Sequence, residues 1–191
     1  IHSSVSGTVI EISSIRSVTG GQDQIIVIES DGKQDVWEEV KPPVINDMKD
    51  FIAAVRASGV VGLGGAAFPT HIKLTPKNLE EVDTLIVNAA ECEPFITSDH
   101  RLMLENTQFI IDGILAVMKY LNLKTAHIGV EENKPDAIEK LRKEISDRGH
   151  SDDIKVDVLR ARYPQGAERV MVYEITGKTL KAGMLPAEVG V

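Results

Sequence analysis

The regular alternation of apolar runs with amphipathic segments over residues 84–177 constrains the fold of this chain more than any other feature. Three short runs predict strands: residues 84–87 are wholly apolar, as buried parallel strands are, residues 126–130 form the next strand, and residues 154–159 alternate as a strand. Apolar residues at helical spacing follow each run, which predicts three helices: residues 101–121, 134–148 and 168–176. Strands that alternate with such helices form a parallel sheet with right-handed crossovers. The sequence therefore predicts an α/β domain in which helices flank a parallel sheet.

Within the predicted helix 101–121, one face is apolar. We expect its buried stripe to consist of six residues: Phe109, Ile110, Ile114, Val117, Met118 and Leu121. A further helix is expected from residue 48, where Asn46 or Asp47 can cap its start and Gly59 can end it.

The first 36 residues follow a different pattern. Two β-rich runs, residues 5–12 and 25–28, are separated by glycine turns. This resembles half of a barrel-sandwich module of the lipoyl or biotinyl type, but no Met-Lys-Met attachment site is present, so we expect a structural role without either group. Pro42-Pro43 marks a boundary. We therefore expect a small β domain over residues 1–40 and the α/β domain over residues 41–191.

Composition bears on several classes of function. The net charge of −8 argues against nucleic acid and anionic membrane as main partners, because both require clustered Lys and Arg. The single cysteine, Cys92, excludes a disulfide framework and a cysteine-ligated metal or iron–sulfur site within this chain. No apolar run approaches the length of a membrane span, so we expect no direct membrane insertion. The chain runs from Ile1 to a strand-like segment at residues 185–191, and we expect it to be a piece of a longer polypeptide.

A glycine-rich stretch, residues 59–73, contains four glycines in seven residues, then Pro69 and Lys73. Glycine is favoured where backbone takes positive φ or approaches another surface closely. The stretch is either a tight connection between packed elements or a cradle in which backbone N–H groups and Lys73 hold a phosphate. Its spacing matches neither the P-loop nor the dinucleotide fingerprint.

An acidic loop follows the predicted strand 84–87. Glu91, Glu93 and Asp99 repel phosphate but suit ribose hydroxyls, a carboxamide or a ring N–H, and alternate residues of extended backbone point the same way. A solvated acidic turn remains an alternative, as does Cys92 as a nucleophile, although it lacks a basic neighbour. An oxygen-rich metal site would draw on five residues: Glu91, Glu93, Asp99, His100 and His71.

A second loop, residues 163–168, follows the predicted strand 154–159. Pro164 and Gly166 shape a turn, and Glu168 lies in the first turn of the next helix, where it either contacts a ligand or complements the helix dipole. Because both loops follow parallel strands, we expect them at the same rim of the sheet, where ligands of such folds bind.

Taken together, three motifs in order resemble the RnfC family, the peripheral subunit of the Rnf electron-transport complex. These are GLGGAAFPT at residues 62–70 with Lys73, NAAECEP at 88–94 with DHR at 99–101, and YPQGAE at 163–168. The closing GMLPAEVG at 183–190 extends the resemblance. The core is more distantly similar to the flavin- and nicotinamide-binding subunit of respiratory complex I, whose loops read GRGGAGFPTGxK, NADESEP and GEE. The resemblance implies a Rossmann-like sheet preceded by the β module.

The resemblance also implies non-covalently bound FMN that exchanges a hydride with NADH. By position, the cofactor-binding residues would be Gly62, Gly64, Gly65 and Lys73 against the flavin, with Asn88 and Glu91 as hydrogen-bonding groups. The NADH-binding residues would be Phe68, by stacking, together with Glu93, Gly166 and Glu168. No catalytic side chain and no metal ligand are expected, because the cofactor carries the chemistry.

The chain departs from the complex I pattern at Leu63, Ala67, Ala90 and Ala167. The alanines at 90 and 167 remove two polar ligand contacts of that pattern. The 4Fe–4S clusters of the family require cysteines that this chain lacks. We therefore expect ferredoxin-like and ubiquitin-like ligand-binding (SLBB) domains beyond Val191, and no electron exit within this piece.

The leading hypothesis is the FMN- and NADH-binding part of an ion-translocating NADH:ferredoxin oxidoreductase, which passes electrons between NAD(H) and iron–sulfur carriers. It implies other Rnf subunits as partners and a cytoplasmic, peripheral position on the inner face of the cell membrane. The isolated piece is not expected to be active alone. Two alternatives share the core: a flavin-free docking module, and a related protein of the cobalamin-reductase or quinone-reductase A type.

Overall fold

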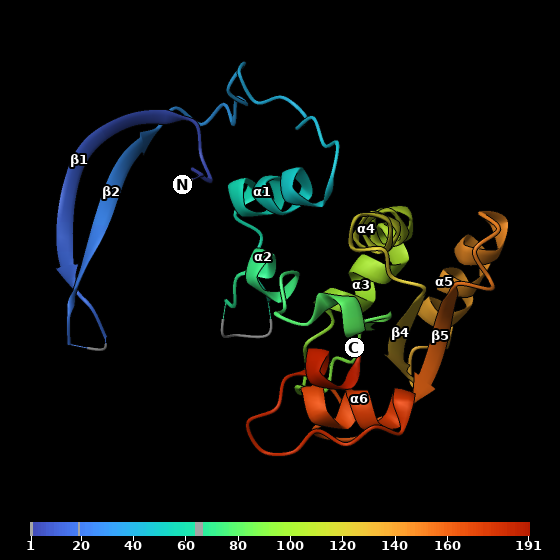
Figure 1. Cartoon of the computed structure of the whole chain (residues 1–191). Coiled ribbons are helices and arrows are strands. Elements are labelled where there is room, and N and C mark those ends of the chain that lie inside the picture. Colours follow the sequence, from blue (N-terminus) through green and yellow to red (C-terminus); the bar gives the residue numbers. More distant parts are fainter. Residues whose placement is uncertain (1, 19, 64–66) are drawn as a thin grey trace.

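The computed structural model describes residues 2–18, 20–63 and 67–191. A two-stranded hairpin at the N-terminus projects away from an α/β body that contains the remaining elements (Figure 1). The body has a sheet of three parallel strands, so the predicted α/β class is confirmed.

The hairpin pairs β1 (Gly7–Arg16) with β2 (Gln22–Ser30) in antiparallel register. Most of its side chains are exposed, and Ile12 has 70% of its surface open to solvent. A contact to the body runs from the segment before β1, where His2 Nε2 lies 2.7 Å from the Ala57 carbonyl. An isolated hairpin is marginally stable in water. The assignment of residues 1–40 and 41–191 to separate domains stays a prediction.

The sheet of the body has the order β3 (Thr84–Asn88), β4 (Thr125–Glu131) and β5 (Ile154–Leu159). The central strand β4 alternates between two packed faces. Ala126, Ile128 and Val130 are fully buried in the main apolar core. Gly129 faces the other way, where an added Cβ would lie 2.5 Å from the Met171 sulfur.

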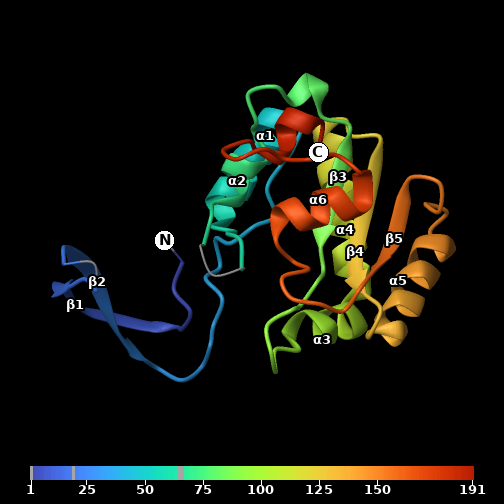
Figure 2. The same cartoon turned by 90° about the horizontal axis from the view of Figure 1, so that it is seen from below.

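Helices cover both faces of the sheet. The main core contains side chains of α4 (Thr107–Leu121) and α5 (Pro135–Asp147), and α3 (Ser98–Glu105) packs beside them. The opposite face is covered by α6 (Glu168–Thr176), which crosses the sheet in Figure 2. The short distance between Gly129 and Met171 means that α6 lies very close to β4, where only glycine fits.

The predicted single helix 101–121 is wrong, because the structure divides it at Asn106 into α3 and α4. Asn106 has φ −131° and ψ 33°, so the helical phase restarts after it. The inward face of α4 consequently includes Ile111, which is fully buried, while the expected stripe residue Phe109 is 65% exposed.

The segment between the hairpin and the glycine-rich stretch ends in a helix. The helix α1 (Met48–Ser58) is capped by Asp47, whose Oδ1 accepts the Asp50 N–H at 2.9 Å, and ends at Gly59 with φ 72°. Phe51 stacks on Tyr120 with ring centroids 4.8 Å apart, which packs α1 on α4. The expected cap and stop signals of this helix are confirmed, and it is followed by α2 (Thr70–Lys73).

The strand-like interpretation of residues 185–191 is wrong. The segment Pro186–Val189 is a 3-10 helix, close in space to another at Leu79–Glu81. Proline cannot donate to a strand ladder, and the Glu188 side chain accepts the Leu185 N–H at 2.8 Å, which favours the turn. Among the described residues, no helix is long and apolar enough to cross a membrane.

Candidate functional site

The carboxyl ends of the three parallel strands converge on one rim of the body. An open pocket of about 450 Å³ lies there, between the loops that follow β3, β4 and β5. Its lining includes residues 91–97, Glu131, Lys134 and residues 161–163. This is the position at which open parallel sheets bind ligands.

The two predicted rim loops are joined directly. Asn88 Nδ2 donates to the Gly166 carbonyl at 2.8 Å, and Asn88 Oδ1 accepts the Ala90 N–H at 3.2 Å. A Cβ at Gly166 would lie 3.2 Å from the Ala90 carbonyl oxygen, so glycine permits this close approach. The expectation that both loops lie at the same rim is confirmed.

Glu91 is nearly buried, with 9% of its surface exposed. Its Oε1 accepts the Asp99 N–H at 2.8 Å and its Oε2 accepts the His100 N–H at 3.3 Å. Both donors belong to the first turn of α3, where a carboxylate is favoured by the helix dipole. Glu91 is therefore occupied in holding the start of α3.

Glu93 lines the same pocket but has an exposed side chain. Its carboxylate lies 3.8 Å from the Cys92 sulfur. Of the two glutamates in this loop, Glu93 therefore presents the carboxylate that a bound ligand could reach.

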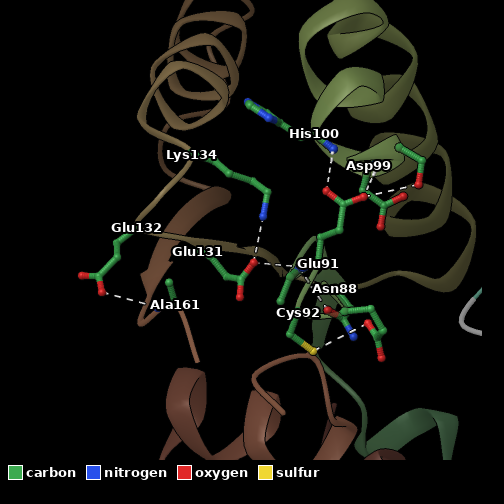
Figure 3. A network of polar contacts seen from close by, with 12 residues as sticks. Asn88, Glu91, Cys92, Asp99, His100, Glu131, Glu132, Lys134 and Ala161 are labelled. Atoms are coloured by element: carbon green, nitrogen blue, oxygen red, sulfur yellow. Dashed lines mark hydrogen bonds and ion pairs between the residues drawn. The ribbon is translucent and has the colours of Figure 1, made fainter. Parts of the chain in front are cut away.

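A buried ion pair lies at the end of β4, and the sequence reasoning missed it (Figure 3). Lys134 Nζ donates to Glu131 Oε2 at 2.8 Å, and the two side chains are 8% and 3% exposed. The same oxygen accepts the Glu91 N–H at 3.1 Å. The sequence signal for this pair is a glutamate at the end of the strand, followed by a lysine three residues later.

The surroundings of Glu91 affect neighbouring carboxyl groups. Burial, together with the nearby Glu91 carboxylate, raises the pKa of Asp99, while Lys134 opposes the shift. On the outer side of α3, His100 Nε2 lies 2.8 Å from Asp136 Oδ1, and this hydrogen bond lowers the pKa of Asp136.

The glycine-rich stretch forms its own closed loop. Gly62 N–H donates to the Phe68 carbonyl at 2.8 Å, and Thr70 N–H donates to the Val60 carbonyl at 3.2 Å. Lys73 Nζ lies 6.0 Å from the centre of the Phe68 ring and 3.5 Å from the position that a Cβ at Gly62 would take. The structure thus groups Gly62, Phe68 and Lys73.

Two predicted cofactor-binding residues of this loop, Gly64 and Gly65, lie outside the described residues. Lys73 is exposed and forms no ion pair with a carboxylate among the residues that the structure describes. It is therefore available to an anionic ligand.

Glu168 begins α6 with an exposed side chain. The residue before it, Ala167, provides no side-chain cap, so Glu168 is the acidic group at the positive end of this helix. Both roles considered for Glu168, dipole complement and ligand contact, are compatible with this position.

The loop before α6 also contains a buried amide that the sequence did not reveal. Gln165 is fully buried, and its Oε1 accepts the Arg162 Nε–H at 3.0 Å. Its Nε2 has no partner among the described residues. In the described parts of the chain, no group of three or more His, Cys, Asp or Glu side chains is arranged to hold a metal ion.

A family model described as the Nuo51 FMN-binding domain matches residues 55–191. Two curated relatives are each 42% identical over 194 aligned residues that include all of this chain. One belongs to the proton-translocating ferredoxin:NAD(+) oxidoreductase complex of Clostridium ljungdahlii, and the other to the Na(+)-translocating complex of Acetobacterium woodii. The chain covers 41% and 43% of their lengths, respectively. These matches confirm the resemblance that the three loop motifs indicate together.

Two solved structures of an NAD+-reducing [NiFe]-hydrogenase are similar in fold. The air-oxidized state matches with a TM-score of 0.61 at 21% identity, and the H2-reduced state with 0.59 at 19%. Each match covers 74% of this chain and 26% of the other chain. At this identity the likeness concerns the fold alone, which it confirms.

Proposed function

Because this chain belongs to the family of the Nuo51 FMN-binding domain, we propose that it is the FMN- and NADH-binding part of an RnfC-type electron-transport subunit. In this role it passes electrons between NAD(H) and iron–sulfur carriers. Bound FMN supplies two-electron exchange with the nicotinamide and one-electron exchange with those carriers. The protein binds, orients and shields the reactants.

The observation that carries this proposal is the junction of Asn88 with Gly166. It unites two of the three motif loops at the rim where parallel sheets bind ligands, beside the 450 Å³ pocket. Separate loops could serve unrelated contacts, but loops fixed to one another form one surface.

The residues present fit FMN at two points. Lys73 is an exposed cation without a carboxylate partner among the described residues. It lies beside the backbone of Gly62, and a phosphate group is bound by such a combination of a cation and backbone N–H groups. Asn88 is exposed, and the second N–H of its amide, beside the one that binds Gly166, could donate to the ring or ribityl chain. Gly62, Lys73 and Asn88 would hold the cofactor, with Gly64 and Gly65 as further proposed contacts.

Glu91 is assigned a less direct role than the motif alone suggests. Both of its carboxylate oxygens already accept backbone N–H groups of α3. We assign it the task of fixing the shape of the loop that faces the flavin. This keeps Glu91 in the cofactor-binding set without requiring a free carboxylate.

We assign the contacts with NADH to side chains that are exposed and can therefore reach a bound nucleotide. Phe68 is 46% exposed and can stack on a nicotinamide ring, while the exposed Glu93 and Glu168 can accept hydrogen bonds from hydroxyl or amide groups. Gly166 lets the second rim loop approach closely enough to complete the site.

The wider role follows from the relatives. They are named as parts of ferredoxin:NAD(+) oxidoreductase complexes that translocate protons or Na(+). We accordingly propose other members of such a complex as partners, and a peripheral position on the cytoplasmic face of the cell membrane. The 4Fe–4S clusters and the SLBB domain belong to the additional length of the relatives in this proposal.

One observation favours a flavin-free docking module as a second candidate. Ala90 and Ala167 stand where the complex I pattern has carboxylates, and Glu91 is occupied by α3. A protein of the cobalamin-reductase or quinone-reductase A type would share this core.

Titration with FMN separates these candidates. Quenching of FMN fluorescence should saturate with a dissociation constant in the micromolar range or below, and the purified chain should show a visible flavin absorbance band. Lys73→Ala should weaken binding, whereas Lys77→Ala, an exposed lysine nearby, should not. Absence of binding at high micromolar FMN would favour the docking module.

A further inference from the structure

The buried pair of Glu131 and Lys134 is the feature of the rim that the proposed function does not yet explain. Both residues are buried, with side chains that are 3% and 8% exposed, respectively. Replacing a buried ion pair by apolar side chains is often neutral or stabilising, so stability alone is a weak reason for its presence.

The geometry of Glu131 supplies a second role. Its Oε2 accepts both Lys134 Nζ at 2.8 Å and the Glu91 backbone N–H at 3.1 Å. One oxygen therefore connects the end of the central strand β4 to the loop that follows β3. Figure 3 shows this connection, with Glu91 extending from it toward the start of α3.

Lys134 pairs with the Glu131 carboxylate and affects a neighbouring one. The Glu91 carboxylate helps to raise the pKa of Asp99 and Lys134 lowers it, so Lys134 also acts on this neighbouring pair. His100 is directed to Asp136 instead. Lys134 thus pairs with Glu131 and also opposes the repulsion between the Glu91 and Asp99 carboxyl groups.

We propose that Glu131, whose Oε2 accepts both Lys134 Nζ and the Glu91 N–H, is a positioning residue that holds residues 88–93 in the shape required to bind the nucleotides. It acts through the Glu91 backbone, and so fixes Asn88 on one side and Glu93 on the other. This inference rests on the proposed function, because the ligand is the one proposed there.

Two double variants separate positioning from stability. Glu131→Gln with Lys134→Met removes both charges but keeps a side-chain oxygen that can accept the Glu91 N–H. Glu131→Met with Lys134→Met also removes both charges but leaves no acceptor. Both avoid an unpaired buried charge, so both are expected to fold.

The control is an ion-paired residue at the opposite end of the sheet. Arg148 joins α5 to α4 through Asp112, with 2.5 Å between Nη1 and Oδ1, and also contacts Glu144. Arg148→Met should lower stability without affecting the rim.

Two measurements on the full 191-residue chain provide the readouts. The first is hydrogen exchange of the Glu91 amide without ligand. Losing its acceptor should accelerate exchange about tenfold or more in the Met/Met variant, while the Gln/Met variant stays near wild type. The second is FMN affinity by fluorescence quenching, which should fall about tenfold in Met/Met and less than threefold in Gln/Met and Arg148→Met.

Equal FMN affinity in the two double variants, at equal folded fractions, would overturn the positioning role. A wild-type chain that binds no FMN would instead overturn the proposed function, and the exchange of the Glu91 amide would still decide whether Glu131 holds the loop. Unchanged exchange in the Met/Met variant would refute the inference whatever the affinity shows.

Discussion

The two walls of the proposed site are built in opposite ways. The loop after β3 is fixed from three sides: Asn88 binds the loop before α6, Glu91 binds the start of α3, and the Glu91 backbone binds Glu131 on β4. In the glycine-rich wall, residues 59–73, the backbone hydrogen bonds that the structure describes all join partners within residues 56–75. One wall is thus preorganised by the core, and the other is closed mainly on itself.

This difference suggests that the two walls have different roles in binding. A wall anchored in the core keeps its polar groups in place before a ligand arrives, so less ordering is needed on binding. A glycine-rich wall can adjust its backbone to a phosphate, with Lys73 supplying charge from an exposed position. The predictions below test whether the anchored wall contributes mainly stability and the glycine-rich wall mainly affinity.

The largest effect is expected for Glu91→Ala. It leaves the backbone donors at the start of α3 without their carboxylate, and should lower the free energy of unfolding by about 2–3 kcal/mol. Urea denaturation measures this. Glu93→Ala, an exposed neighbour, should change stability by less than about 0.5 kcal/mol. A similar loss in both would contradict the anchored wall.

Asn88→Ala should have the next largest effect, because it removes the hydrogen bonds to Gly166 and Ala90. We expect a loss of about 1–2 kcal/mol in the free energy of unfolding. Asn133→Ala is the matched control, since Asn133 is exposed and lines the same pocket. If Asn133→Ala destabilised the chain as much, the loop junction would not be the cause.

A smaller effect is expected for Asp99→Asn. The pKa of Asp99 is raised in the folded protein, mainly by burial, so folding favours its protonated form. Its contribution to stability is present below the ordinary value of 3.8 and is lost as the pH rises through the raised pKa. Asp99→Asn should therefore make the chain more stable at neutral pH, as measured by thermal unfolding against pH.

Asp136, whose pKa shifts in the opposite direction, serves as the control for this prediction. The pKa of Asp136 is lowered, mainly by its hydrogen bond with His100, so its contribution is present above 3.8 and is lost as the pH falls. Asp136→Asn should reduce stability at neutral pH. If both variants shifted stability in the same direction, the charge arrangement around α3 would need revision.

The smallest effect on stability, under about 0.5 kcal/mol, is expected for Lys73→Ala, because Lys73 is exposed. Its effect should appear in FMN affinity, and the loss should shrink at high salt as the charge is screened. Parallel FMN titrations at low and high ionic strength measure this. An affinity loss that does not depend on salt would argue against a phosphate contact at Lys73.

Local patterns made much of the body predictable. The strands at 84–87, 126–130 and 154–159 were identifiable from apolar runs or from alternation, and parallel topology then brought both rim loops to one edge. The helix capped by Asp47 was likewise visible in the sequence. These features depend on neighbouring residues, which is why periodicity and capping reveal them.

Features that depend on tertiary contacts were not predictable. The break at Asn106 moved the inward face of α4 from Phe109 to Ile111, and no local proline or glycine marks it. Glu131 and Lys134 are only three residues apart, but their burial and the hydrogen bond from the Glu91 N–H to Glu131 are tertiary features. The motifs identified candidate ligand contacts, but not that Glu91 supports a helix.

The position of Cys92 gives the chain a built-in reporter. It is the only cysteine in the sequence, it is partly exposed, and it lines the rim pocket between Glu91 and Glu93. A thiol-reactive fluorophore or spin label would therefore attach at one defined point without any engineered residue. Its signal would monitor how the anchored wall responds to a bound nucleotide in solution.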